Sequence, residues 1–555
     1  MIKAGPVRVE RSTMKTARHL IVLTILSAAL YVSAAAEVLE TYAVINCRII
    51  PVTSPPIEKG ALVIRDGLIE SIGPIGTIKI PEDAEIIDAQ GLTAFPGLIS
   101  AHTNLFLETR REERPAAGQA APAGIVAAEK PVRQPGLQAF AQLGPKLSAI
   151  QAWHRLGVTT VLVAPGSGIF AGQSVLVNLN GERPEQMVVK NPAALHIQFV
   201  TERGSYPSSL MGTMAFLRQS FLDAEHYSSH QAEAARLGKG IRRPEYDPFL
   251  EALVPYVVGK KPVIFTCANQ EDIKRALRLR EEFKLNALLS GANEAWRVSE
   301  HLKKAAAPLL VSLDFRPPLS SEVSQKGEEA RKAAEKEVYP ANPGVLSKAG
   351  IRFALTTLGL SDAKAAQKNL HSAVLAGLEP GQALRALTII PAQHLGVDAI
   401  LGSLEPGKIA NVVVARGNIL EQGSEVEEVF CDGILFKVEK APPEGKPQTQ
   451  PVLNLAGAWK LVIRSPMGTF EAAMELKQEG SSLDGFISSE MGKWEIRDGV
   501  LSGGELSFVA VGTVMNQAME MSFSGKAEAE VIEGTLSTSR VAMDVRATRL
   551  PKTAE

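Results

Sequence analysis

Cysteine is scarce in this chain of 555 residues: there are only three, Cys47, Cys267 and Cys431. They lie far apart without CxxC spacing, which argues against a thiolate zinc site or a disulfide framework, and an odd number leaves at least one thiol unpaired. Two alternatives stay open. Cys47 and Cys431 form a disulfide if the two ends of the main domain meet, or each cysteine is a small buried apolar residue.

An excess of charge of one sign is also absent, because 59 Lys and Arg stand against 60 Asp and Glu. Such a balance creates no global field that would attract nucleic acid or an anionic membrane. We therefore expect a small-molecule ligand, a second copy of the chain or another protein as the partner, and no nucleic acid.

A long transmembrane run is missing, but residues 14–36 have a leader pattern. Lys15 and Arg18 precede an apolar core at 20–30, which small residues follow at 33–36. The core is shorter than the ~20 residues that a membrane span needs. The pattern predicts a signal peptide, so the mature chain is expected to be periplasmic or secreted without an integral span. A retained membrane anchor is the alternative.

The length exceeds what one hydrophobic core supports, so several domains are expected. Residues 37–94 and 400–438 show short alternating strands and turns such as Asp66-Gly67, which predicts a composite β-sandwich built from both flanks. Between them, residues 95–399 alternate strand-like apolar runs with helical patterns. This predicts an α/β fold, a (β/α)8 TIM-like barrel, whose third and fourth strands lie somewhere in 174–200.

A Pro-rich linker is predicted at residues 439–451, and residues 452–555 form a second unit of short strands separated by Gly, Ser and Asp turns. The pattern predicts a small C-terminal all-β barrel or sandwich. It contains no cluster of His, Cys or carboxylates, which favours a binding or packing role over catalysis.

Three stretches carry a family resemblance: GALVIRDGLIESIG, IIDAQGLTAFPGLISAHTNL and LGSLEPGKIANVVV. In this order, over residues 41–438, they resemble the amidohydrolase superfamily, especially its imidazolonepropionase-like and secreted members. The C-terminal unit resembles small lipocalin-like β domains. The resemblance implies hydrolysis of C–N bonds, other than peptide bonds, in small molecules, with one or two divalent metals, zinc above all, that activate water.

The metal ligands of the family, as the resemblance implies, are an HxH pair on the first strand, a Lys or Glu on the fourth, His on the fifth and sixth, and an Asp after the eighth. Here His102 keeps the first position, but Asn104 replaces the second His and Thr266 the fifth-strand His. The sixth strand ends in Ser290-Gly291, and Leu358 occupies the usual Asp position. A single ligand does not hold a catalytic metal, so we expect no metal or a weakly bound one.

Other candidates are sparse. Asp314 and Asp362 follow predicted strands and are weak catalytic candidates, with turn and N-cap roles as the alternative. His226 and His230 have metal-binding i, i+4 spacing without the Glu of HExxH, which favours a solvent-facing helix. The run Gly172-Gln173-Ser174 lies in a Gly-rich turn that lacks a phosphate-loop pattern, and it either shapes a binding pocket or is loop architecture.

The sequence is compatible with two functions. The chain is either a divergent hydrolase of weak or absent activity, using an unusual mononuclear or metal-free site, or a pseudoenzyme in the cell envelope that binds a ligand or stabilises a catalytic sister amidohydrolase.

Overall fold

A computed structural model describes most of the chain: residues 40–107, 133–316 except 167 and 202–205, 325–438 except 361 and 422, and 453–550 except 466–467, 481, 491, 503, 515–516 and 538–541. The predicted signal peptide, the linker and most of the Ala- and Pro-rich stretch at 110–136 lie outside these residues. Within the described part, no helix has both the length and the apolarity that a membrane crossing requires.

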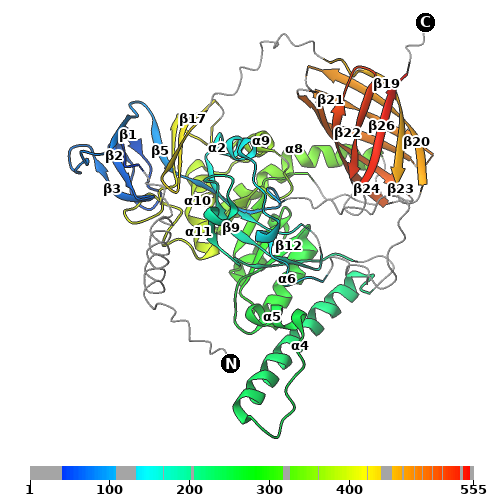
Figure 1. The fold of residues 1–555 in the computed structure, drawn as a ribbon, viewed down its shortest axis with the longest axis horizontal. Helices are drawn as coiled ribbons and strands as arrows, with labels where there is room; N and C mark the ends of the chain where they lie inside the picture. The colour runs from blue at the N-terminus through cyan, green and yellow to red at the C-terminus, as the bar shows by residue number, and fades with distance from the viewer. Residues whose placement is uncertain are drawn as a thin grey trace, which may run out of the picture.

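The main domain is a (β/α)8 barrel, as the sequence predicts (Figure 1). Its strands form two sheets of the order β10-β9-β7-β6 and β15-β14-β13-β12-β11-β8, in which β10 (Val188–Lys190) is a short edge strand antiparallel to β9. Seven barrel strands run parallel: β6 (Leu98–Thr103), β7 (Val158–Val163), β11 (Leu195–Gln198), β12 (Val263–Cys267), β13 (Ala287–Gly291), β14 (Leu309–Ser312) and β15 (Phe353–Thr356).

The remaining position of the barrel is filled by two short strands in one bent segment, β8 (Phe170–Gln173) and β9 (Val175–Asn178). β9 pairs antiparallel with β7, and β8 pairs antiparallel with β11, so the bend at Ser174 joins the two sheets. Gly172 makes the bend possible. It has φ +119°, and a Cβ there would lie 2.5 Å from the carbonyl oxygen of Leu137.

The other seam of the barrel lies between β6 and β15, and a side-chain contact spans it. Ser100 Oγ lies 2.8 Å from Thr357 Oγ1 and accepts a hydrogen bond from the Thr357 backbone N–H at 3.2 Å. These bonds replace ladder hydrogen bonds where the two strands approach each other.

Helices surround the strands, and several begin at capping residues that the sequence displays. Asp247 caps α5, Asn269 caps α6 and Ser209 caps α4, each through backbone N–H groups of the first turn. The helices are α2 (Leu147–His154), α3 (Pro184–Met187), α4 (Leu210–Leu237), α5 (Pro248–Val257), α6 (Gln270–Glu282), α7 (Ser299–Ala305), α8 (Gln325–Lys348), α9 (Ala363–Leu375), α10 (Pro380–Ala386) and α11 (Ile389–Leu395).

The two flanks of the barrel meet in one eight-stranded sheet. Its strands come from both ends of the main domain: β1 (Tyr42–Ile49), β2 (Ile57–Arg65), β3 (Leu68–Pro74), β4 (Glu85–Asp88), β5 (Thr93–Pro96), β16 (Val412–Arg416), β17 (Glu425–Cys431) and β18 (Ile434–Lys437). β5 and β16 pair antiparallel and join the flanks. Cys47 and Cys431 both lie in this sheet, yet all three cysteines are free and buried.

The C-terminal unit is a closed antiparallel barrel. Its strands are β19 (Gly457–Ser465), β20 (Gly468–Glu479), β21 (Ser482–Ser489), β22 (Gly492–Ser502), β23 (Glu505–Val514), β24 (Gln517–Ala527), β25 (Val531–Ser537) and β26 (Ala542–Arg549). Its interior is apolar, with Trp459 fully buried and the rings of Phe508 and Phe523 stacked 4.7 Å apart. A small cavity of about 10 Å³ remains among these side chains, and its lining is entirely apolar.

Candidate functional site

The interior of the (β/α)8 barrel has an apolar floor and a polar upper layer. Ile99, Leu162, Ile264, Leu288 and Leu310 belong to the floor cluster. Farther along the same strands, toward the carboxyl ends where enzymes of this architecture hold their active sites, polar side chains take over. Four of them form the candidate site: His102, His196, Thr266 and Ser290.

His102 lies at the carboxyl end of β6 and is 3% exposed. Its Nδ1 atom is hydrogen-bonded to Ser290 Oγ on β13 at 2.7 Å. Burial lowers the pKa of His102 to about 4, so the ring is neutral at pH 7. A neutral imidazole is able to bind a metal or accept a proton, but here one of its two nitrogens is already engaged by a hydroxyl.

His196 on β11 is the neighbour of His102 inside the barrel, with ring centroids 4.6 Å apart in an edge-to-face arrangement. It is 1% exposed, and neither of its ring nitrogens has a hydrogen-bond partner. Burial, and to a smaller extent the proximity of His102, lowers the pKa of His196 well below its ordinary value. His196 is therefore a buried polar group whose donor and acceptor are both unused.

The sequence places His196 after an ill-defined strand from which it can approach the barrel mouth, but this does not identify it as a site residue. The signal is present in Leu195-His196-Ile197-Gln198, where a polar residue interrupts a buried strand. In the structure His196 is in register with Ile264 of β12, which belongs to the barrel floor, so the histidine faces the interior.

Thr266 and Ser290 complete the polar layer from β12 and β13, on which they are in register with each other. The Thr266 hydroxyl is buried and has no hydrogen-bond partner, whereas Ser290 is bonded to His102. The positions of the fifth- and sixth-strand histidines of the resemblance thus carry two small hydroxyl side chains that face the same interior as His102 and His196.

Asn104 and Leu358, at the remaining family positions, lie outside this buried group. Asn104 is exposed in the loop after β6. Leu358 is half-buried after β15, and its carbonyl oxygen accepts a hydrogen bond from Ser312 Oγ at 2.5 Å. Its apolar side chain has no group that takes up a proton.

Asp314 is engaged by Arg316 rather than by a histidine. Its two carboxylate oxygens accept hydrogen bonds from Arg316 Nε and Nη2, both at 2.8 Å. Gly359 packs against it so closely that a Cβ there would lie 2.4 Å from Asp314 Oδ2. The bidentate pair fixes the loop after β14.

Asp362 serves as a helix cap, accepting a hydrogen bond from the backbone N–H of Ala365 at 2.7 Å at the start of α9. Gln173 and Ser174 also make structural bonds: Gln173 Nε2 donates to the Pro135 carbonyl at 3.0 Å, and Ser174 Oγ donates to the Ala194 carbonyl at 3.2 Å. With Gly172 at the bend, this run joins the two barrel sheets.

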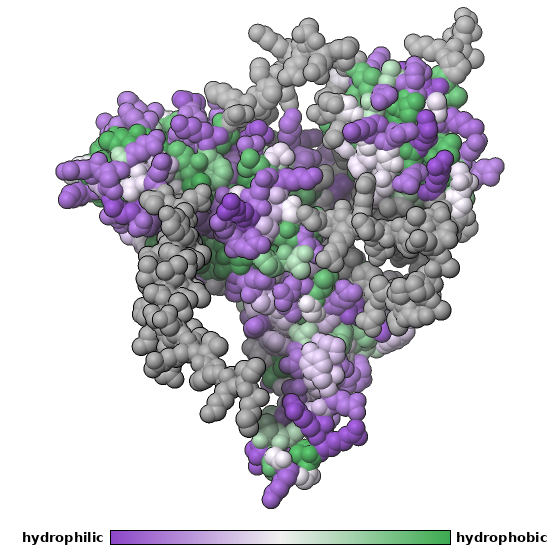
Figure 2. Space-filling view, in the orientation of Figure 1, coloured by the Kyte–Doolittle hydropathy of each residue, from purple (hydrophilic) through white to green (hydrophobic). Residues whose placement is uncertain are grey.

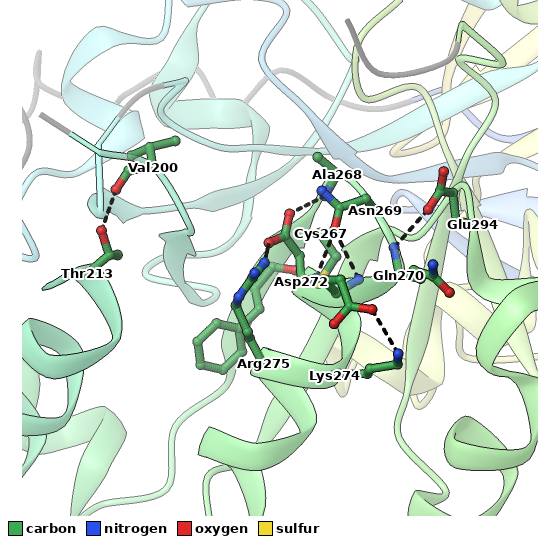
Figure 3. Close-up of polar contacts among 12 residues, drawn as sticks. Val200, Thr213, Cys267, Ala268, Asn269, Gln270, Asp272, Lys274, Arg275 and Glu294 are labelled. Atoms are coloured by element: carbon green, nitrogen blue, oxygen red, sulfur yellow. Dashed lines mark hydrogen bonds and ion pairs between the residues drawn. The ribbon is translucent and has the colours of Figure 1, made fainter. Parts of the chain in front are cut away.

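The rim after β12 is a closed polar network (Figure 3). Asn269 Oδ1 accepts hydrogen bonds from the N–H groups of Glu271 and Asp272, and Glu294 Oε2 accepts from Gln270 N–H at 3.0 Å. Asp272 is buried and pairs with Arg275 at 2.6 Å. Because these side chains satisfy the first N–H groups of α6, this helix end does not offer them to an anionic ligand.

His226 and His230 lie on α4, away from the barrel interior, with their rings 6.0 Å apart. His230 Nε2 donates to the carbonyl oxygen of Arg242 at 2.9 Å, which ties the segment after the helix to the helix itself. His230 therefore has a structural role on this arm.

The residues of the barrel interior do not fit the divalent metal that the resemblance implies. A catalytic zinc takes three protein ligands from His, Asp, Glu or Cys. The interior offers two imidazoles, one of them bonded to Ser290, and otherwise hydroxyls. Across the described residues there is no group of three or more His, Cys, Asp or Glu side chains placed to hold a metal ion.

Comparison with known proteins agrees with the fold. Residues 269–437 match the amidohydrolase family. The chain is 26% identical over 394 residues to the imidazolonepropionase of Symbiobacterium thermophilum, covering 64% of this chain and 84% of the relative. It is 25% identical to the imidazolonepropionase of Solibacter usitatus, covering 67% and 91%. An amidohydrolase structure from Thermotoga maritima is 28% identical with a TM-score of 0.60, covering 71% of this chain and all of that one.

The matched region, the (β/α)8 barrel and the motifs at its two flanks define one class of protein. By this fold and these matches the chain is similar to the amidohydrolase superfamily.

Proposed function

We propose that this protein is a divergent member of the superfamily that binds a small neutral molecule at the barrel mouth, while the metal-dependent hydrolysis of amide-like C–N bonds is weak or absent. The observation that carries the proposal is the environment of His102. Its neighbours inside the barrel are a serine hydroxyl at 2.7 Å and a second neutral imidazole, where a metal site needs additional imidazole or carboxylate ligands.

The class of ligand follows from the charges in this layer. Burial keeps both His102 and His196 neutral at pH 7, and Thr266 and Ser290 are hydroxyls. A charged ligand group would have no counter-charge here and would lose its hydration. A neutral group with both a donor and an acceptor, such as an amide, fits best, and imidazolonepropionases among the relatives are consistent with an amide-like ligand.

Metal analysis tests the proposal. Protein prepared with zinc and manganese in excess should contain well under one equivalent of metal per chain, and His102→Ala should not change that value. One equivalent that disappears in His102→Ala would contradict the proposal. His154→Ala is the matched control, because His154 is also a buried neutral histidine but lies in α2, outside the barrel interior.

A second candidate is a metal-free hydrolase, and the 2.7 Å contact between Ser290 and His102 favours it. In such a pair Ser290 Oγ attacks the acyl carbon of an amide while its proton passes to His102 Nδ1. His102 then gives this proton to the leaving nitrogen as the C–N bond breaks, and water hydrolyses the acyl-serine and restores the Ser290 hydroxyl. Both side chains are almost fully buried, so this candidate requires the mouth to open. A fluorophosphonate adduct on Ser290 that is lost in His102→Gln and kept in Ser312→Ala would support it.

Export to the periplasm or medium belongs to the same proposal, because residues 14–36 have the pattern of a cleaved leader. Mass spectrometry of the protein recovered from its native host tests it: the expected N-terminus lies between residues 34 and 38. Copurification from the same envelope fraction tests for a catalytic sister chain or a second copy as the partner.

A further inference from the structure

Helix α4 extends beyond the body of the protein as an arm (Figure 1). It has 28 residues, about 42 Å at 1.5 Å per residue. Its buried residues end at Tyr227, so the last ten residues, about 15 Å, project without burying a side chain in the barrel. The arm thus presents its end, residues 236–243, to the surroundings. We call these residues the α4 tip.

Hydrogen bonds fix the conformation of the α4 tip. Gly238 ends the helix in the left-handed conformation with φ +69°, and its N–H donates to the Ala234 carbonyl at 3.1 Å. The returning segment is then bound to the helix by the hydrogen bond from His230 Nε2 to the Arg242 carbonyl, at 2.9 Å. Farther back, Tyr227 Oη accepts from the Asp247 N–H at 3.4 Å.

The charge of the α4 tip departs from that of the whole chain. It reads RLGKGIRR, with four cations and no carboxylate, while the chain as a whole is balanced. Two flanking carboxylates compensate for part of this charge: Arg236 pairs with Glu233 at 2.6 Å and Arg242 with Glu245 at 2.9 Å. Lys239 and Arg243 are exposed and have no carboxylate partner within the described part of the chain.

Apolar side chains lie between these cations. Leu237 is 44% exposed, and Ile241 is half-buried between Gly240 and Arg242. Figure 2 shows hydrophilic and hydrophobic residues side by side at this end of the molecule. Cations that attract anionic headgroups, together with an aliphatic side chain that enters the acyl boundary, are the combination that binds the surface of a membrane.

We propose that the α4 tip docks the protein reversibly on an anionic phospholipid bilayer. Lys239 and Arg243 supply the unpaired charge, and Leu237 supplies the apolar contact. A cation near such a surface strengthens binding about fivefold, so the few cations of one tip give weak attachment that salt weakens further. The barrel interior takes no part, and the proposal stands independently of the ligand proposed above.

Cosedimentation with vesicles tests the charge. Full-length protein should bind vesicles of equal phosphatidylglycerol and phosphatidylcholine more than vesicles of phosphatidylcholine alone. The double change Lys239→Glu/Arg243→Glu should reduce the phosphatidylglycerol-dependent binding at least about tenfold. The matched control Lys303→Glu/Lys304→Glu, which makes the same charge change at exposed sites on α7, should keep it. Lys239→Gln/Arg243→Gln repeats the test without new negative charge.

A local label tests the contact itself. The three native cysteines are buried, so a new exposed cysteine is labelled selectively. An environment-sensitive fluorophore on Leu237→Cys should shift to the blue with phosphatidylglycerol vesicles. The same fluorophore on Leu375→Cys, a leucine of α9 that is 75% exposed, should not shift. Three results would overturn the proposal. The first is equal binding by the α4 tip variant and its control, and the second is a Leu237→Cys label that does not shift. The third is a dimer that the charge reversal dissociates without any lipid binding.

Discussion

The protein contains two barrels with different interiors. The C-terminal barrel is filled by apolar side chains, among them Trp459, Phe508 and Phe523. The (β/α)8 barrel has the same kind of floor, but its upper layer holds His102, His196 and other polar groups, some without hydrogen-bond partners. Buried polar groups without partners are unfavourable for stability. Two of them, His196 and Thr266, lie together in this layer, whereas the described part of the C-terminal barrel has a single one, Trp494 Nε1. Their clustering marks the place where the (β/α)8 barrel has been shaped for something other than packing.

Histidines make this difference measurable, because all nine precede residue 395 and the C-terminal barrel has none. Burial lowers the pKa of His102, His154 and His394 from 6.5 to about 4, and that of His196 well below its ordinary value. Below pH 6.5 the unfolded chain therefore binds more protons than the folded one. The free energy of unfolding of the (β/α)8 barrel falls as the pH falls from 6.5 to 4.

The largest predicted effect is this loss in acid. One pKa unit corresponds to about 1.4 kcal/mol. Each histidine whose pKa is lowered to about 4 therefore reduces the free energy of unfolding by about 3 kcal/mol at pH 4, relative to neutral pH. Hydrogen exchange by mass spectrometry, corrected for intrinsic rates, should show amides of the (β/α)8 barrel losing protection between pH 6.5 and 4.5. An equal loss of protection in the C-terminal barrel, which has no histidine, would show that the buried histidines do not cause the effect.

Trp459→Ala should destabilise the C-terminal barrel by about 3–5 kcal/mol, because the side chain is fully buried and its Nε1–H donates to the Leu455 carbonyl at 2.9 Å. Urea unfolding followed by hydrogen exchange should move only the transition of residues 453–550. As a control, Trp494→Phe should have a smaller effect than Trp459→Phe, because the Nε1–H of Trp494 has no partner. The reverse order would show that the interior does not depend on this bond.

His196→Leu should stabilise the (β/α)8 barrel by about 1 kcal/mol, because it removes two buried nitrogens without partners and keeps an apolar side chain of similar size. His154→Leu should instead destabilise it by about 1 kcal/mol, since His154 Nε2 donates to the Leu179 carbonyl at 3.0 Å. Urea midpoints at pH 7.5 measure both. Destabilisation by His196→Leu would indicate that a bound group satisfies this histidine.

The smallest predicted effect concerns a helix cap. Asp362→Ala should cost about 1 kcal/mol, because the backbone N–H of Ala365 loses its acceptor, whereas Asp362→Asn should cost less, since its side-chain oxygen still accepts. Thermal denaturation measures the difference. If both variants instead abolished ligand binding at unchanged stability, Asp362 would belong to the site and not to the scaffold.

Much of the fold was predictable from sequence because its signals are local. Period-2 alternation and Asp66-Gly67 mark the hairpin of β2 and β3, and Asp362 marks the start of α9. The bent third strand was not predictable, since β8 and β9 are too short for a clear period. Their antiparallel direction depends on Gly172 approaching the Leu137 carbonyl, a contact between distant parts of the chain.

The candidate site was also predictable only in part. The sequence alone determined that His102 ends a strand, because it follows an apolar run. The family resemblance placed Asn104, Thr266, Ser290 and Leu358 at the positions of the usual ligands. Only the tertiary structure decided which of these residues meet. Barrel closure brings His196 of β11 within 4.6 Å of His102 and hydrogen-bonds His102 to Ser290, 188 residues farther along the chain. The physical reason is that hydrogen bonding and desolvation depend on neighbours across the barrel, which strand periodicity does not encode.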